Sequence, residues 1–193
     1  MKTSILAAAL GLAFSAGAFA QAGTVQRDVN QQERIEQGLK SGQLNTREAS
    51  RLEGEEARVE RDQSRAMQDG KLSPAEKARL GREQNQVSRD IYREKHDAQT
   101  GNPASASSQR IQADVQRNVN QQQRIEQGVQ SGSLTTRETA KLERGQAGDS
   151  KKEARAGADG HVGEKEQRRV QQAENRQSKR IHREKHDAQT QTK

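Results

Sequence analysis

Two histidines near the end of the chain have a spacing that could bind a transition metal. His182 and His186 lie four residues apart, so they would share one face of a helix. Paired imidazoles of this kind bind zinc, copper or nickel. The related segment 90 residues earlier has Tyr92 in place of the first histidine. The alternative is therefore that both histidines are solvent-exposed residues of a basic helix.

Four glycine-containing turns resemble the second half of a calcium-binding EF-hand loop. In each turn a glutamate follows the glycine by six residues, as Glu48 follows Gly42 and Glu76 follows Gly70. An EF-hand loop also needs oxygen ligands at its first and third positions. This chain has glutamine or arginine at the first position and an apolar residue or glycine at the third. Helix capping explains the glutamates without a metal, and we expect no cofactor.

The residue types give no support for catalysis. The chain has no cysteine, and it contains neither a Gly-x-Ser-x-Gly motif nor a phosphate-binding loop. Its many carboxylates are expected in i, i+4 ladders with Arg and Lys, which are typical of solvated helical faces. Only 28% of the residues are hydrophobic, too few to favour the apolar pocket that most enzymes use. We expect that the protein is not an enzyme.

The positive charge is unevenly distributed along the chain. The formal net charge is +7. Residues 25–100 carry 15 basic and 15 acidic side chains, whereas residues 115–190 carry 16 and 11. A nucleic-acid function would favour a basic first half and aromatic stacking platforms. Nucleic acid is therefore not an expected partner, but the basic second half could bind an anionic surface.

The first 20 residues are typical of a cleaved signal peptide. Lys2 precedes an apolar run that ends in Ala18-Phe19-Ala20, which predicts cleavage between Ala20 and Gln21. The run is shorter than the roughly 20 residues that a membrane-spanning helix needs. We therefore expect a periplasmic or secreted protein with no transmembrane segment after cleavage.

The remainder of the chain contains one sequence unit twice, 90 residues apart. Residues 25–38 match 115–128, residues 41–48 match 131–138, and residues 91–100 match 181–190. We expect all-α units at 25–100 and 115–190, joined by a flexible linker over 101–114. In each unit, apolar residues at helical spacing predict three helices.

Turn and capping residues predict where the helices begin and end. Glycines just after a helix favour a left-handed conformation, and Ser, Thr or Asn three residues before Glu forms a capping box. The predicted turn and cap residues are Gly42, Asn45, Glu48, Gly70, Ser73, Glu76, Gly132, Thr135 and Glu138.

The second unit has lost apolar residues and gained glycines. Residues equivalent to Glu55, Arg58 and Met67 are glycines there, and each interior glycine costs a helix about 1 kcal/mol relative to alanine. We therefore expect residues 144–163 to be frayed or disordered.

Two resemblances bear on function. The pattern R-I-x-x-G-x-x-S-G-x-L, followed by D-G-x-L-S-x-x-E and I-Y-x-x-K-H-D, resembles a group of exported helical proteins of Gram-negative bacteria and implies a periplasmic address. Separately, 44–48, 72–76 and 134–138 resemble the L-T-x-x-Q motif of the Spy/CpxP stress family, with Glu in place of Gln. That family is all-helical and acts as chaperone or metal-stress adaptor.

These observations lead to three functional hypotheses. The first is a non-enzymatic periplasmic protein, possibly stress-related, that binds other proteins or envelope components. The second is transition-metal binding or buffering through His182 and His186. The third is anionic-surface binding by the basic second unit.

Overall fold

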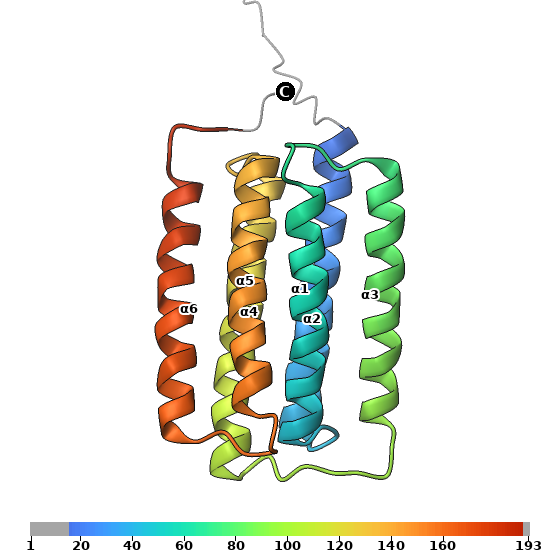
Figure 1. Ribbon diagram of the computed structural model, residues 1–193, viewed down its shortest axis with the longest axis vertical. Coiled ribbons are helices and arrows are strands. Elements are labelled where there is room, and N and C mark those ends of the chain that lie inside the picture. The colour runs from blue at the N-terminus through green and yellow to red at the C-terminus, as the bar shows by residue number, and fades with distance from the viewer. Residues whose placement is uncertain (1–15, 191–193) are drawn as a thin grey trace, which may run out of the picture.

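The protein is all-α over the residues that the structure describes. The computed structural model describes residues 16–190, with side chains from Gln21 onward. Within that range lie six helices: α1 (Ala16–Ser41), α2 (Thr46–Ala66), α3 (Pro74–Lys95), α4 (Ala106–Gln130), α5 (Thr136–Ala156) and α6 (Glu164–Lys185) (Figure 1). The predicted signal peptide lies largely outside this range, and α1 continues through Ala20 and Gln21.

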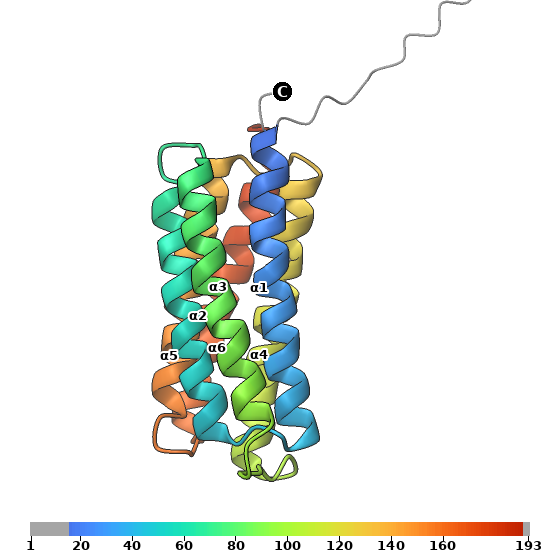
Figure 2. The ribbon, with the colours of Figure 1, turned by 90° about the vertical axis from the view of Figure 1, so that its right-hand side faces the viewer.

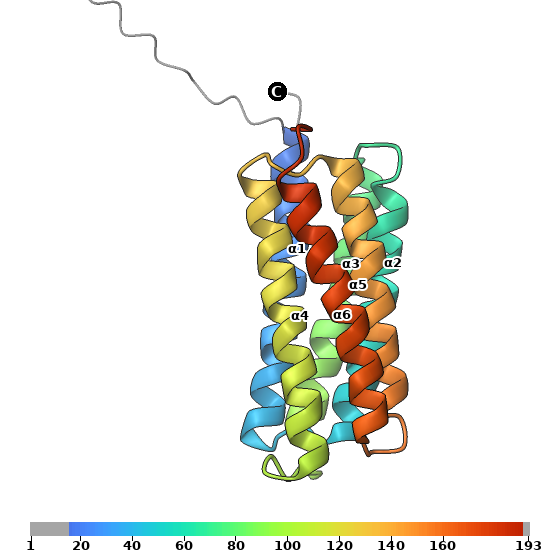
Figure 3. The same cartoon turned by 90° about the vertical axis from the view of Figure 1, so that its left-hand side faces the viewer.

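Four helices form the centre of the bundle, and one further helix packs on each side of them. α1 packs along α4 and α2 packs along α5, and these are the most extensive helix pairs. α3 covers α1 and α2 on one side, while α6 covers α4 and α5 on the other (Figure 1, Figure 2). α6 crosses the outside of α4 and α5 in the opposite side view (Figure 3). No described helix is long and apolar enough to cross a membrane.

Local capping chemistry sets the helix boundaries. Asn45, Ser73 and Thr135 each accept a hydrogen bond from the backbone N–H of a glutamate three residues later, and that glutamate bonds back to the cap. α6 differs, because Gly163 at its N-cap has no side-chain oxygen to accept such a bond. The turns contain glycines with positive φ angles, where other residues would be strained. These are Gly42, Gly70, Gly132 and Gly160, with φ between 74° and 90°.

The apolar core is shared between the two halves of the chain. One cluster joins Leu52 and Ile91 of the first half to Ile111 and Val162 of the second. A second cluster places Val25 among residues of α4, α5 and α6. The expected picture of two units joined by a flexible linker therefore needs correction, because residues 106–114 of that linker form the first turns of α4 and Ile111 is buried.

The expected fraying over residues 144–163 is also corrected by the structure. α5 runs without a break from Thr136 to Ala156. Gly145 of α5 and its C-cap residue Gly157 make room for neighbouring side chains: a Cβ on Gly145 would lie 2.0 Å from Gln177 Oε1, and one on Gly157 would lie 1.9 Å from Ser50 Oγ. The absence of a side chain thus permits close packing that offsets the cost in helix propensity.

Candidate functional site

The predicted histidine pair forms a ring stack at the end of α6. The rings of His182 and His186 have centroids 4.2 Å apart and planes tilted by 36°. His186 Nδ1 lies 2.7 Å from the carbonyl oxygen of His182. Tyr92 and His96 form the equivalent stack at the end of α3, with centroids 4.1 Å apart. Because nitrogen lone pairs lie in the ring planes, joint chelation of one ion would require these rings to leave the stack.

A seam of buried polar side chains fills the centre of the bundle, between α1, α2, α4 and α5. Glu53 is fully buried on α2, and its Oε2 accepts a hydrogen bond of 3.1 Å from Gln32 Nε2 on α1. On the other side, Asn118 Nδ2 donates to both carboxylate oxygens of Glu153 at 2.9 Å. Much of the interior between these four helices is therefore polar, beside the apolar clusters that the two halves share.

Glu60 connects the two halves directly across this seam. Its Oε1 accepts a bond of 3.1 Å from Gln122 Nε2, and its Oε2 accepts one of 3.0 Å from Ser150 Oγ. Gln122 also donates to Glu143 Oε2 at 3.3 Å. Amides and hydroxyls therefore provide the donors, and none of these contacts to a seam carboxylate comes from Lys or Arg.

Both halves contain a hydrogen-bonded pair of an acid and an amide at equivalent positions, although the position of the acid differs between them. In the first half the amide of Gln63 donates to Asp28 Oδ2 at 2.7 Å. The positions 90 residues later are Glu153 and Asn118, so the acid and the amide have changed places while the hydrogen bond remains. The pair itself, rather than either residue, is what this part of the bundle requires.

Burial favours the protonated form of many of the seam acids. Desolvation raises the pKa of Asp28 and of Glu53 to about 7. It also raises the pKa of Glu60 well above its ordinary value, and the neighbouring Glu143 carboxyl acts in the same direction. A protonated carboxyl can donate as well as accept, so protonation helps to satisfy a seam that is rich in acceptors.

The outer face of the α2–α5 pair carries a basic groove. Its floor consists of small residues, with the Cβ of Ala154 only 3.4 Å from the position a Cβ on Gly54 would take. The groove has a volume of about 550 Å³. We call it the basic groove and define it by the small residues Gly54, Ala57, Ala147, Gly148, Ala154 and Ala158 and the cations Arg58, Arg61, Arg144, Lys151 and Arg155.

The cations of the basic groove are exposed and largely without acidic partners. All five side chains belong to exposed residues. Arg61 lies 3.9 Å from Asp62, whereas Arg58, Arg144, Lys151 and Arg155 take part in no ion pair among the described residues. Like charges gathered along one groove repel one another, so an anion bound there would relieve an existing electrostatic cost.

The sequence contained a signal for the seam that charge counting overlooked. Glu53, Glu56 and Glu60 recur at helical spacing, and none of them has Lys or Arg three or four residues away. The expectation that the carboxylates lie in solvated ladders is therefore wrong for this stripe, which is fully buried. The basic groove had no comparable signal, because its cations come from both halves of the chain.

Comparison of the chain with protein-family models, with curated proteins and with solved structures finds no match. The functional argument therefore depends on the chemistry of these side chains.

Proposed function

We propose that this chain is a non-enzymatic, exported helical protein that binds an anionic lipid surface of the bacterial envelope through the basic groove. The observation that supports this function is the row of cations, four of the five without an ion pair among the described residues, over a floor of alanine and glycine. Lipid phosphates would lie against the guanidinium groups, which bind phosphate with two parallel hydrogen bonds. The small residues of the floor let a headgroup approach the helices closely.

Binding of unfolded proteins has less support from the surface. A chaperone of the Spy/CpxP kind would present exposed apolar area to its clients. Among the side chains described, Tyr92 is the one large hydrophobic residue that is exposed. The transition-metal alternative at His182 and His186 has no support beyond their spacing, because the rings stack on each other.

Vesicle co-sedimentation tests the proposal. The full mature chain is mixed with vesicles of phosphatidylglycerol and phosphatidylcholine, or of phosphatidylcholine alone, at increasing salt. We expect binding only to the anionic vesicles, weakening steeply as salt screens the charges. Each basic residue near an anionic membrane contributes about 1 kcal/mol, so Arg144→Glu with Lys151→Glu should weaken binding by more than tenfold.

A charge-matched variant provides the control. Arg176→Glu with Lys179→Glu makes the same charge change on exposed residues of α6, away from the groove. We expect this variant to retain most of the binding. Equal losses in the two variants would show that net charge, and not the groove, is responsible, and equal binding to neutral vesicles would refute the proposal.

A further inference from the structure

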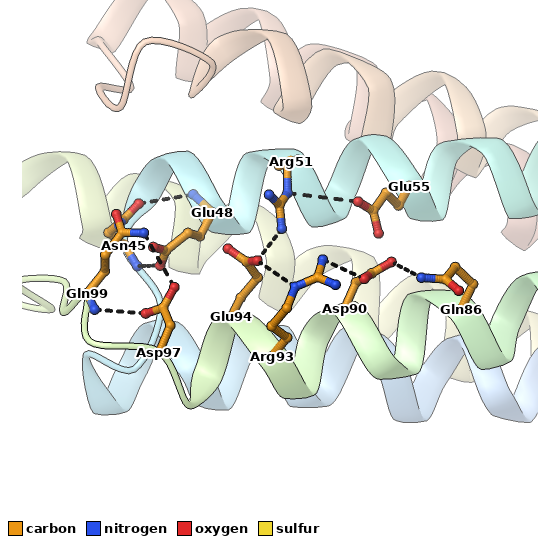
Figure 4. Close-up of polar contacts among 10 residues, drawn as sticks. All are labelled: Asn45, Glu48, Arg51, Glu55, Gln86, Asp90, Arg93, Glu94, Asp97 and Gln99. Carbon is orange, nitrogen blue, oxygen red and sulfur yellow. Dashed lines mark hydrogen bonds and ion pairs between the residues drawn. The ribbon is translucent and has the colours of Figure 1, made fainter.

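Three carboxyl groups meet where the start of α2 lies beside the end of α3. Glu48, Glu94 and Asp97 each offer one oxygen, and these three atoms all lie within 4.8 Å of one another. Figure 4 shows the three side chains between the two helices. We call them the first carboxylate cluster.

The same arrangement occurs 90 residues later. Glu138, Glu184 and Asp187 form a second carboxylate cluster, with its three oxygens again within 4.8 Å of one another. All three residue types are identical to those of the first cluster. The clusters therefore persist in both halves, although much of the intervening sequence has diverged.

The capping glutamates aim a buried, unsatisfied oxygen at each cluster. Glu48 is 6% exposed and Glu138 is 1% exposed. In each, Oε2 accepts the bond of the capping box, at 2.9 Å from Asn45 N and at 2.8 Å from Thr135 N. Oε1 has no hydrogen-bond partner in either residue. A buried polar atom without a partner costs about 1–3 kcal/mol, which points to a missing positive ligand.

Neighbouring basic residues do not neutralise the clusters. Arg51 and Arg93 both make ion pairs with Glu94, and in the second cluster Lys141 Nζ lies 3.9 Å and Arg183 Nη2 lies 3.5 Å from Glu184. Three carboxylates thus face two cations, and both cations contact the same glutamate. The pKa of Glu48 is raised by burial and also by the nearby charges of Asp97 and Glu94.

We propose that each carboxylate cluster binds one Ca²⁺ ion, giving two sites per chain. Oxygen-only ligands select a hard cation, and Ca²⁺ accepts an irregular shell of oxygens at about 2.3–2.6 Å, whereas Mg²⁺ demands near-ideal octahedral geometry. Water completes the coordination. Such a site, with three protein ligands at the protein surface, belongs to the range of extracellular calcium modules, with Kd on the order of 10⁻⁴–10⁻³ M.

These sites differ from the EF-hand loops considered from the sequence. An EF-hand takes its ligands from one continuous loop. Here the glutamate of one helix start joins two acids from the end of another helix, as Glu48 joins Glu94 and Asp97. The proposal also does not depend on lipid binding, because the basic groove and the clusters have no residue in common.

The test is a Ca²⁺ titration of the full chain, followed by calorimetry and by backbone amide NMR. We expect two sites, and amide shifts confined to the segments around residues 45–48, 94–99, 135–138 and 184–189. Glu48→Gln with Glu138→Gln should weaken binding by more than tenfold. Glutamine also serves in a capping box, so the helices should stay folded, as circular dichroism would show.

Glu76 and Glu166 supply the matched control. They occupy the same capping position in α3 and α6 but belong to neither carboxylate cluster. Glu76→Gln with Glu166→Gln should bind two Ca²⁺ ions like the wild type. The proposal is overturned if wild-type shifts are absent or lie elsewhere, or if the control loses as much affinity as the cluster variant. Asp97→Asn with Asp187→Asn gives a second loss of affinity that leaves both capping glutamates intact.

Discussion

The buried acids of the central seam predict an unusual dependence of stability on pH. Most proteins lose stability in acid, because their carboxylates are paired in the folded state and have low pKa values. Here burial raises the pKa of Glu53 from 4.5 to about 7. The folded state therefore binds a proton more tightly than the unfolded state. The stabilisation is complete below pH 4.5 and is lost as the pH rises through 7.

The size of the effect follows from that one side chain. Each pKa unit corresponds to about 1.4 kcal/mol, so the rise at Glu53 amounts to about 3 kcal/mol between pH 4.5 and pH 8. Domains are stable by about 5–15 kcal/mol, which makes this loss a large fraction of the total. Glu60 and Glu143 are fully buried as well, and their raised pKa values act in the same direction.

Urea denaturation from pH 4.5 to pH 8 measures the effect. We expect the free energy of unfolding of the wild type to fall across this range. Glu53→Gln keeps an acceptor for Gln32 but cannot ionise, so it should lose about 3 kcal/mol less, a difference of about 1–3 M in the urea midpoint. Glu164→Gln, on an exposed residue, should leave the pH dependence of the free energy of unfolding like that of the wild type. Stability that is flat or rises with pH, or equal slopes for the two variants, would refute the reasoning.

Three substitutions test the packing of the second half by thermal or urea unfolding. Gly148→Ala should stabilise α5 by about 1 kcal/mol, because only Lys152 Nζ lies near the added Cβ, at 3.8 Å. Gly157→Ala should destabilise by about 1–3 kcal/mol, because the new Cβ would lie 1.9 Å from Ser50 Oγ; stability equal to that of Gly148→Ala would contradict this packing. Gly163→Ser should supply the missing cap and gain about 0.3 kcal/mol, because glycine is itself a tolerated N-cap residue, and a loss of stability would argue against the N-cap geometry.

Local chemistry made the helices predictable from the sequence. Cap and turn signals depend on residues within one or two turns of each other, so Ser73-Pro74 and Asp69-Gly70 indicate boundaries without knowledge of the fold. The prediction that residues 144–163 are frayed was wrong because it considered the local sequence alone. Helix propensity describes an isolated helix, whereas the cost at Gly145 is offset by the hydrogen bond of 2.8 Å that Gln177 Nε2 makes to the Leu142 carbonyl oxygen in the space a Cβ would fill.

The pairing of the halves could not be derived from either half alone. The seam and the basic groove both form where α2 meets α5, which begin 90 residues apart in the chain. A duplicated sequence indicates that two similar surfaces exist, but it does not indicate that they face each other. The sequence predicts only a capping role for Glu48 and Glu138, because the acids that join them in the clusters come from other helices or the turns that follow them.

Many carboxyl groups of this protein are buried, whereas the cations of the basic groove are exposed. This distribution changes the net charge that the folded molecule carries in solution. The formal value of +7 counts every carboxylate as ionised. Yet burial raises the pKa of Asp114 to about 7 and that of Glu174 to about 8, so these buried acids are largely neutral in mildly acidic solution. The cations of the basic groove, in contrast, are exposed. The net charge of the folded molecule is therefore more positive than its formal net charge. Its attraction to an anionic surface should strengthen as the pH falls, in the same pH range in which the bundle is most stable.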